Sequence, residues 1–174
     1  LYEGLARSDA LTGLGNRLAL SDRFAAVAAK GLLTAVHCLD LDRFKPINDR
    51  YGHPTGDALL KAVSQRLSGL LRKGDFAVRT GGDEFVVIQA GITDLAEAES
   101  LAQRIRDTLG TPYVLEGRSI RVGASVGYTL TSDQGYGLER LITCADTALL
   151  DAKASGGGIA AYREPVVLDF RRAG

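Results

Sequence analysis

The sequence has no methionine, two histidines, two cysteines and no excess of charge of either sign. Its 21 basic side chains balance 21 acidic ones, so the chain as a whole lacks the net positive charge that is typical of nucleic-acid-binding proteins. No apolar run approaches the ~20 residues of a membrane-spanning helix, and no signal-peptide pattern is present. We therefore expect no nucleic-acid partner, no membrane segment in this chain and a cytoplasmic location.

Cys38 and Cys144 lie far apart in apolar stretches, which favours reduced core thiols over a disulfide or a metal pair. His37 and His53 have no partners at the spacing of a zinc site. Walker-type and dinucleotide-binding glycine loops are also missing, so any phosphate would be held by a metal and by lysines. Because the chain starts at Leu1 and has no methionine, we expect it to be a piece of a longer polypeptide.

The 174 residues are enough for one domain with a proper core. Residues 1–8 would end an incoming linker helix, 9–162 would form the domain, and 163–174 would be a tail or linker. Apolar residues at helical spacing predict helices over residues 18–29, 43–51, 58–71, 95–109 and from 138 to the glycines at 156–158.

Strand signals alternate with these helices. Residues 34–41 form an almost continuous apolar run that predicts a central strand buried on both faces. Residues 76–78 and 85–88 predict a β-hairpin, and residues 113–115 with 120–130 predict a second one, bent at Glu116-Gly117. This order predicts an α+β fold in which helices cover a mostly antiparallel sheet.

The first hairpin carries Arg79-Thr80-Gly81-Gly82-Asp83-Glu84-Phe85 at its turn. Adjacent carboxylates raise one pKa unless a cation neutralises them, although a solvated acidic turn is the simpler interpretation of this motif alone. Asp40 ends the buried strand, and if the two strands are neighbours, three carboxylates converge. Such oxygen ligands suit Mg²⁺ or Mn²⁺, with Lys45 and Lys153 as partners for phosphates, unless these lysines are simply solvated.

Three blocks together carry a family resemblance: RTGGDEF, DLDRFKPINDRYGHPTGD at Asp40 to Asp57, and DALTGLGNR at Asp9 to Arg17. In this order and spacing they resemble the GGDEF family of diguanylate cyclases, from about Asp9 to Gly156. The resemblance implies a ferredoxin-like palm of the nucleotidyl cyclase type, in agreement with the α+β order.

The resemblance implies a nucleotidyltransferase of bacterial signalling. Two GTP molecules, one per domain of a homodimer, would condense to cyclic di-GMP with release of pyrophosphate. Asp40, the backbone carbonyl of Leu41 and Asp83 would hold two Mg²⁺ (or Mn²⁺) ions per active site. Glu84 would be either the general base or a further metal ligand.

Substrate contacts are implied at matching positions. Lys45 and Lys153 would neutralise phosphates, Asn48 and Asp57 would read guanine, and two glycines would let the backbone approach the nucleotide. The implied substrate-binding set is Phe44, Lys45, Asn48, Asp57, Gly81, Gly82 and Lys153.

Arg72 and Asp75 match the family's RxxD site for inhibition by the product, although an exposed ion pair would give the same four-residue pattern. One departure stands at Gly157, where the family usually carries an arginine that contacts the triphosphate. Leu150 replaces a frequent tyrosine, which we interpret as a packing change.

Three hypotheses follow. The first is an active, product-inhibited diguanylate cyclase domain attached to sensory or effector domains outside this chain. The second, motivated by Gly157, is a catalytically weak GGDEF-like domain that binds GTP or cyclic di-GMP and regulates a neighbouring domain. The third is a related palm-type nucleotidyltransferase with other substrates, against which Asp57 argues.

Overall fold

The computed structural model describes residues 6–131 and 137–163. Its helices are α1 (Arg17–Ala29), α2 (Phe44–Tyr51), α3 (His53–Leu70), α4 (Leu95–Leu109) and α5 (Leu138–Ala154). Its strands are β1 (Thr34–Asp42), β2 (Phe76–Gly81), β3 (Glu84–Ala90), β4 (Tyr113–Leu115), β5 (Arg118–Ile120), β6 (Gly123–Leu130) and β7 (Ile159–Ala161).

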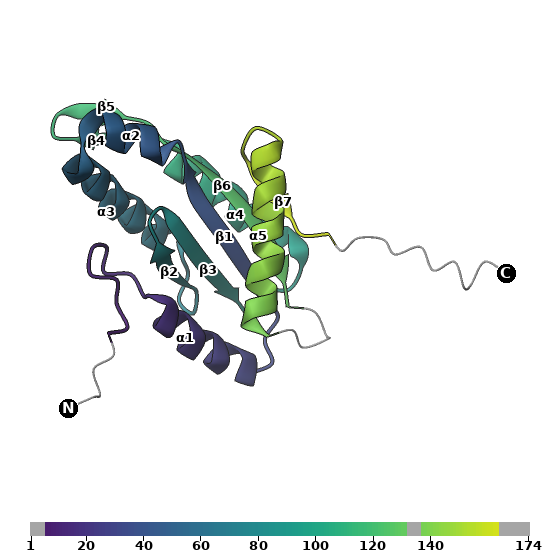
Figure 1. Ribbon diagram of the computed structural model, residues 1–174. Coiled ribbons are helices and arrows are strands. Elements are labelled where there is room, and N and C mark those ends of the chain that lie inside the picture. Colours follow the sequence, from purple (N-terminus) through teal and green to yellow (C-terminus); the bar gives the residue numbers. More distant parts are fainter. Residues whose placement is uncertain (1–5, 132–136, 164–174) are drawn as a thin grey trace.

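The main sheet has the strand order β2-β3-β1-β6-β7, and β4 and β5 form a separate two-stranded ribbon (Figure 1). All pairs in the main sheet are antiparallel except β6 with β7, which run parallel. The α+β fold with a mostly antiparallel sheet is therefore confirmed.

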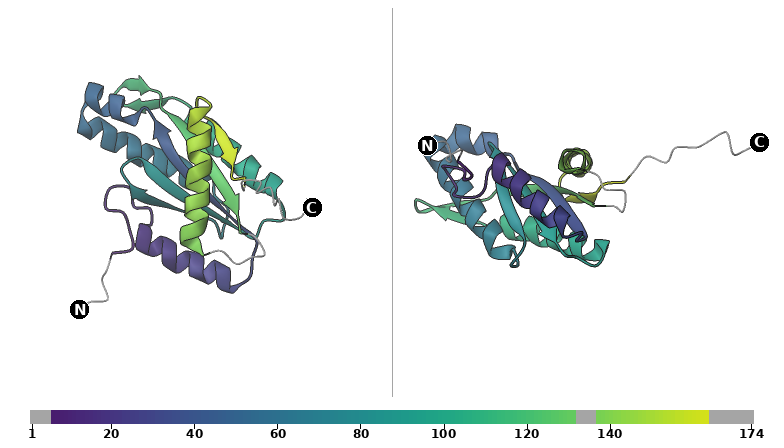
Figure 2. Two further views of the ribbon diagram at one scale, coloured as in Figure 1. Left: turned by 45° about the vertical axis from the view of Figure 1, so that its right-hand side comes forward. Right: turned by 90° about the horizontal axis from the view of Figure 1, so that it is seen from below.

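Two layers of helices cover the sheet, α1 and α5 on one face and α3 and α4 on the other (Figure 2). The central strand β1 is buried on both faces, as its apolar run predicts. Because side chains alternate along a strand, Leu39 packs toward α3 and α4 while Cys38 packs toward α1 and α5. Asp40 lies on the same face of the sheet as Cys38, toward α5, where it forms an ion pair with Lys153.

Helix α5 lies unusually close to the sheet at Gly127. A Cβ at this position would overlap the backbone of Ala145 and Leu149, so only glycine permits this approach. The close packing fixes the path of the helix that carries Lys153. In the described part of the chain, no helix combines the length and the apolarity that crossing a membrane requires.

Helix α3 begins earlier than predicted. The predicted helices over residues 43–51 and 58–71 leave residues 52–57 as a break, yet α3 starts at His53. Gly52 turns the chain with a φ of 91°, and Pro54 fits in the first helical turn, where its missing N–H costs nothing. The break is thus a single residue, and Asp57 lies on a helix.

The second predicted hairpin is wrong in its longer arm. Glu116 and Gly117, both with positive φ, form the turn, but β4 pairs with the short strand β5. The chain then leaves the strand conformation at Arg121 and Val122 before β6 enters the main sheet. Strand β7 was not predicted. Residues 6–8 of the predicted incoming helix are not helical, and residues 1–5 and 164–174 lie outside the described residues.

Candidate active site

The acidic residues of two strands meet at one rim of the sheet. Strands β1 and β3 are neighbours, and their register places Asp40 directly opposite Glu84. The backbone N–H of Leu41 donates to the carbonyl of Asp83 at 3.3 Å, which joins the end of β1 to the hairpin turn. The structure thus brings Asp40, Leu41, Asp83 and Glu84 together, and we call this group the carboxylate rim.

Asp40 is only 8% exposed, which is unusual for a carboxylate. Its Oδ2 forms an ion pair with the Lys153 ammonium from α5, while its Oδ1 is buried without a hydrogen-bond partner. Burial raises the pKa of Asp40, and the charges of Asp83 and Asp42 raise it further against the opposing effect of Lys153. A negative charge here therefore needs more cation than Lys153 alone supplies.

The donor set fits a hard divalent cation. Mg²⁺ prefers carboxylate, carbonyl and water oxygens, and Asp40 offers an unpartnered oxygen beside the carboxylate of Asp83. Among residues 6–131 and 137–163, however, no three acidic, histidine or cysteine side chains stand close enough to form a ready-made metal cluster. Lys153 is the cation paired with Asp40 in this arrangement.

The hairpin turns one residue later than at its two glycines. Gly81 pairs with Glu84, so the two turn residues are Gly82, with a φ of 50°, and Asp83. A register shift between Arg79 and Gly81 leaves Thr80 as a bulge. Bulges re-aim neighbouring side chains and are frequent beside active sites.

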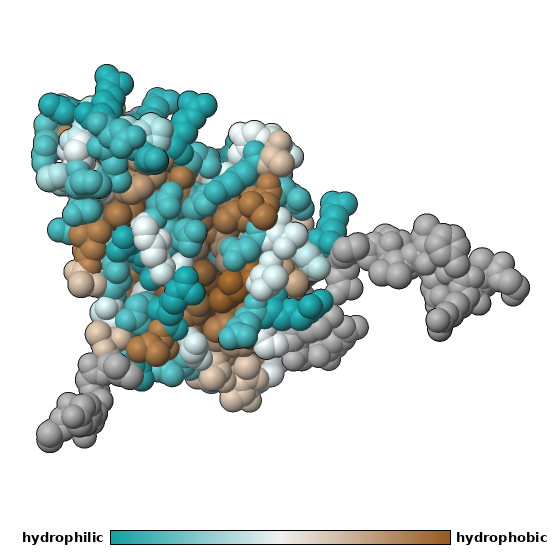
Figure 3. All heavy atoms as spheres, viewed as in Figure 1, coloured by the Kyte–Doolittle hydropathy of each residue, from teal (hydrophilic) through white to brown (hydrophobic). Residues whose placement is uncertain are grey.

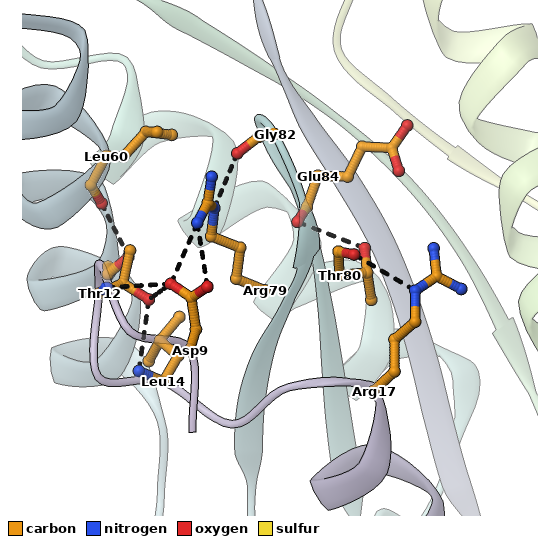
Figure 4. A network of polar contacts seen from close by, with 10 residues as sticks. Asp9, Thr12, Leu14, Arg17, Leu60, Arg79, Thr80, Gly82 and Glu84 are labelled. Atoms are coloured by element: carbon orange, nitrogen blue, oxygen red, sulfur yellow. Dashed lines mark hydrogen bonds and ion pairs between the residues drawn. The ribbon is translucent and has the colours of Figure 1, made fainter. Parts of the chain in front are cut away.

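The N-terminal motif holds this hairpin in place (Figure 4). Arg79 donates through Nη1 to the Asp9 carboxylate at 3.0 Å and through Nε to the carbonyl of Gly82 at 2.8 Å. The Nε of Arg17 donates to the carbonyl of Thr80 at 3.2 Å. No sequence pattern predicts this support of the hairpin, because Asp9 and Arg79 are 70 positions apart.

Asp9 is held in its ionised form. Burial opposes ionisation, but the hydrogen bonds from Thr12 and the Arg79 guanidinium outweigh it and lower the pKa of Asp9. Asp9 therefore positions the hairpin and is saturated with partners.

Helices α2 and α3 bring the residues implied in guanine binding close together. Asn48 of α2 has a buried Oδ1 without a hydrogen-bond partner. A Cβ at Gly56 of α3 would overlap this oxygen, and Asp57 follows next on the exposed side. Lys45 is exposed on α2, and Phe44 packs against the core. The contact of Gly56 with Asn48 was not predicted, because the sequence pattern places Gly56 in a loop between two helices.

Arg72 and Asp75 precede β2, at the end of the strand away from the turn, and β2 alone spans about 17 Å from Phe76 to Gly81 at the rise of an extended strand. The Asp75 side chain is 3% exposed and accepts from the backbone N–H groups of Arg72 and Ala90. The Arg72 guanidinium is exposed, 3.5 Å from Asp75. The structure does not bring this pair to the carboxylate rim.

Two hollows adjoin the rim. A pocket of ≈ 690 Å³ extends from Leu41 and Asp42 to Lys153 and Gly157. On the sheet face between α1 and α5, where Figure 3 shows hydrophobic side chains, a groove of ≈ 330 Å³ reaches Glu84.

Comparisons with known proteins agree with this geometry. The family model described as "Diguanylate cyclase, GGDEF domain" matches residues 6–158. A sensory box/GGDEF family protein from Caulobacter crescentus is 44% identical, with a TM-score of 0.81 over 87% of this chain and 100% of that one.

Among curated relatives from Pseudomonas aeruginosa, cyclic di-GMP phosphodiesterase NbdA is 44% identical over 87% of this chain. Diguanylate cyclase DgcP is 39% identical over 87%. The chain spans 20% of the length of the first protein and 23% of the length of the second. The sequence motifs, the fold and the family match lead to one conclusion: the chain belongs to the GGDEF family of diguanylate cyclase domains.

Proposed function

We propose that this chain is an active diguanylate cyclase domain that condenses two GTP molecules into cyclic di-GMP and pyrophosphate. The observation that carries the proposal is the carboxylate rim. Asp40 lies opposite Glu84 and beside Asp83, and one Asp40 oxygen is buried without a partner. A buried, under-neutralised carboxylate costs stability, and a nucleotide–metal complex would relieve that cost.

The roles of the rim residues follow from their chemistry. Asp40, the Leu41 carbonyl and Asp83 would hold two Mg²⁺ ions, which when bound supply charge neutralisation of the triphosphate and acidify the attacking 3′-hydroxyl. Glu84, exposed at the start of β3, would accept the 3′-hydroxyl proton or complete the ligand set. Lys153 would exchange its bond with Asp40 for the β- and γ-phosphates.

Guanine would bind between α2 and α3. The unpartnered Oδ1 of Asn48 accepts a hydrogen bond, and the exposed carboxylate of Asp57 can accept from the guanine N1–H and N2–H₂ groups. Adenine presents neither donor, so it would leave these acceptors unpaired. Gly82 lets the turn approach the nucleotide without a Cβ.

Each domain would supply one nucleotide, so turnover would need a homodimer. We further propose product inhibition at Arg72 and Asp75, control by sensory or effector domains attached outside this chain, and a cytoplasmic location. Because Asp75 already accepts two backbone hydrogen bonds, the exposed Arg72 guanidinium would make the first contact with the product.

A second function is favoured by one observation. Where the family resemblance implies a phosphate-binding arginine, this chain has Gly157, and the 44% identical relative NbdA carries the name of a cyclic di-GMP phosphodiesterase. The chain would then bind GTP or cyclic di-GMP with little turnover and regulate a neighbouring domain.

The two functions separate when binding and turnover are measured on the same sample. We expect Mg²⁺-dependent GTP binding by calorimetry together with cyclic di-GMP formation, and loss of the product in Asp83→Ala and Glu84→Ala. Tight GTP binding with no more product than in these variants would favour the regulatory function. Equal turnover of ATP and GTP would contradict the guanine assignment.

A further inference from the structure

The pocket of ≈ 690 Å³ beside the carboxylate rim carries an excess of positive charge. Arg43, Arg121 and Lys153 line it, against one acidic side chain, Asp42. Asp42 is partly occupied, because its Oδ1 accepts from Ser125 Oγ at 2.8 Å. The pocket is thus suited to an anion that carries several charges.

Arg121 reaches this pocket because the chain leaves the strand conformation at that point. A continuous strand from residue 120 would have alternated its side chains across the sheet, whereas residues 121 and 122 separate β5 from β6. Arg43, between β1 and α2, also lines the pocket and has a left-handed conformation with a φ of 61°. Such backbone strain in a residue other than glycine is concentrated at ligand-binding sites.

Both guanidinium groups are available. Arg43 and Arg121 are exposed, and within the described ranges neither takes part in a hydrogen bond, an ion pair or a contact with an aromatic ring. This contrasts with Arg66 and Arg79, whose guanidinium groups are committed to carbonyl or carboxylate oxygens. Two unpaired arginines in one pocket repel each other unless an anion lies between them.

Two glycines that precede β7, Gly156 and Gly157, also line the pocket. Gly156, Gly157 and Gly158 have φ values of 91°, 100° and 114°, which side chains other than glycine rarely adopt. An arginine at position 157 would therefore require a different backbone path, so its absence is built into the fold of this segment. Gly156 and Gly157 thus add no side chain to the lining that they share with the two arginines.

We propose that Arg43 and Arg121, together with Lys153, bind the polyphosphate tail of the nucleotide and replace the arginine that is missing at Gly157. The identity of the nucleotide rests on the proposed function, but the anion site does not depend on turnover. Arginine forks bind phosphate oxygens in pairs, so two of them supply the contacts that one residue of the glycine segment cannot.

The test measures anion affinity by calorimetry on the whole chain, with inorganic tripolyphosphate, GTP and GMP as probes in the presence of Mg²⁺. Arg121→Ala and Arg43→Asn are the variants, since asparagine tolerates the left-handed conformation at position 43. Arg104→Ala, at an exposed position on α4 outside the pocket, is the matched control.

We expect each pocket variant to bind tripolyphosphate and GTP roughly tenfold more weakly, while GMP binding and the melting temperature stay unchanged. Arg104→Ala should behave as the wild type. Unchanged tripolyphosphate affinity in both pocket variants, or an equal loss in Arg104→Ala, would overturn the proposal. A wild-type chain that makes no cyclic di-GMP but binds tripolyphosphate through Arg121 would overturn the proposed cyclase activity and retain the anion site.

Discussion

Two acidic residues flank the β2–β3 hairpin, and the fold treats them in opposite ways. Asp9, on the N-terminal side, accepts hydrogen bonds from Thr12 and from the Arg79 guanidinium, and its pKa is lowered. Asp40, on the β1 side, has a raised pKa and one buried oxygen without a partner. One carboxylate is satisfied within the fold, and the other needs a partner from outside it.

This difference assigns separate roles to the two acids: Asp9 positions the hairpin, and Asp40 is available for a ligand. Through Arg79, Asp9 fixes the backbone of Gly82, next to the turn residue Asp83. Asp40 gains nothing comparable, and its burial costs stability that ligand binding can recover. Three experiments, on turnover, stability and pH dependence, test whether the two acids act in these separate ways, and a fourth tests guanine recognition.

The largest effect is expected for turnover in Asp40→Asn. The amide keeps the shape of the side chain but removes the charge that would hold the metal. Loss of several kcal/mol of transition-state stabilisation should lower the rate of cyclic di-GMP formation roughly 1,000-fold. Initial rates by product quantification check this, and a rate within tenfold of the wild type would show that Asp40 is not part of the machinery.

The second effect concerns stability. Asp9→Asn weakens the contact with Arg79 and should lower the free energy of unfolding by about 2 kcal/mol, as expected for hydrogen bonds to a charged group. Asp22→Asn is the control, because its ion pair with Arg7 is more than half exposed on both sides and should contribute little. Urea denaturation measures both variants, and equal stability losses would refute a special role for Asp9.

The third effect concerns guanine recognition. Gly56→Ala would push the Asn48 side chain from its place and should weaken GTP binding about tenfold, the equivalent of one hydrogen bond. Gly69→Ala lies on the same helix α3 with open space around its Cβ, so it should bind GTP normally and gain slight stability. Normal GTP affinity in Gly56→Ala would separate Asn48 from the nucleotide site.

The smallest effect is on the pH dependence of stability, which should change with opposite sign in Asp9→Asn and Asp40→Asn. The lowered pKa of Asp9 means that its carboxylate adds stability above the usual value near 4, and this is lost as the pH falls through the folded pKa. The raised pKa of Asp40 means that its ionisation costs stability as the pH rises. At pH 7 Asp9→Asn should therefore be less stable than the wild type and Asp40→Asn more stable.

The difference for Asp40→Asn should shrink once the pH falls below the usual value near 4, whereas the difference for Asp9→Asn should persist to lower pH, until the folded pKa of Asp9 is passed. Denaturation curves at pH 7 and over a descending series of acidic pH values measure this. The same sign for both variants at pH 7 would contradict the distinction between the two acids.

The sequence predicts the layers of the fold better than its junctions. The apolar run of β1 and the helical spacing of α4 and α5 are local patterns, and the structure confirms these elements. The start of α3 at His53 was missed, because glycine and proline near a helix start are also typical of loops. The interruption at Arg121 was missed, because a polar residue in an alternating run fits the pattern of a strand.

The site shows the same division. The motifs identify Asp40, Asp83 and Glu84 as residues of one site, and the register of β1 and β3 brings them to one rim. The ion pair of Lys153 with Asp40 and the support of the hairpin by Asp9 join residues 113 and 70 positions apart. Such contacts depend on how the layers pack, and no local pattern reports them.

The central claim is that the carboxylate rim performs guanylyl transfer. The most direct measurement incubates the chain with GTP and Mg²⁺ over a series of protein concentrations and identifies the product by mass, with Glu84→Ala in parallel. The account predicts cyclic di-GMP whose rate per domain rises with protein concentration, since the reaction needs two domains, and none from the variant. No product at any concentration, or equal product from Glu84→Ala, would contradict it.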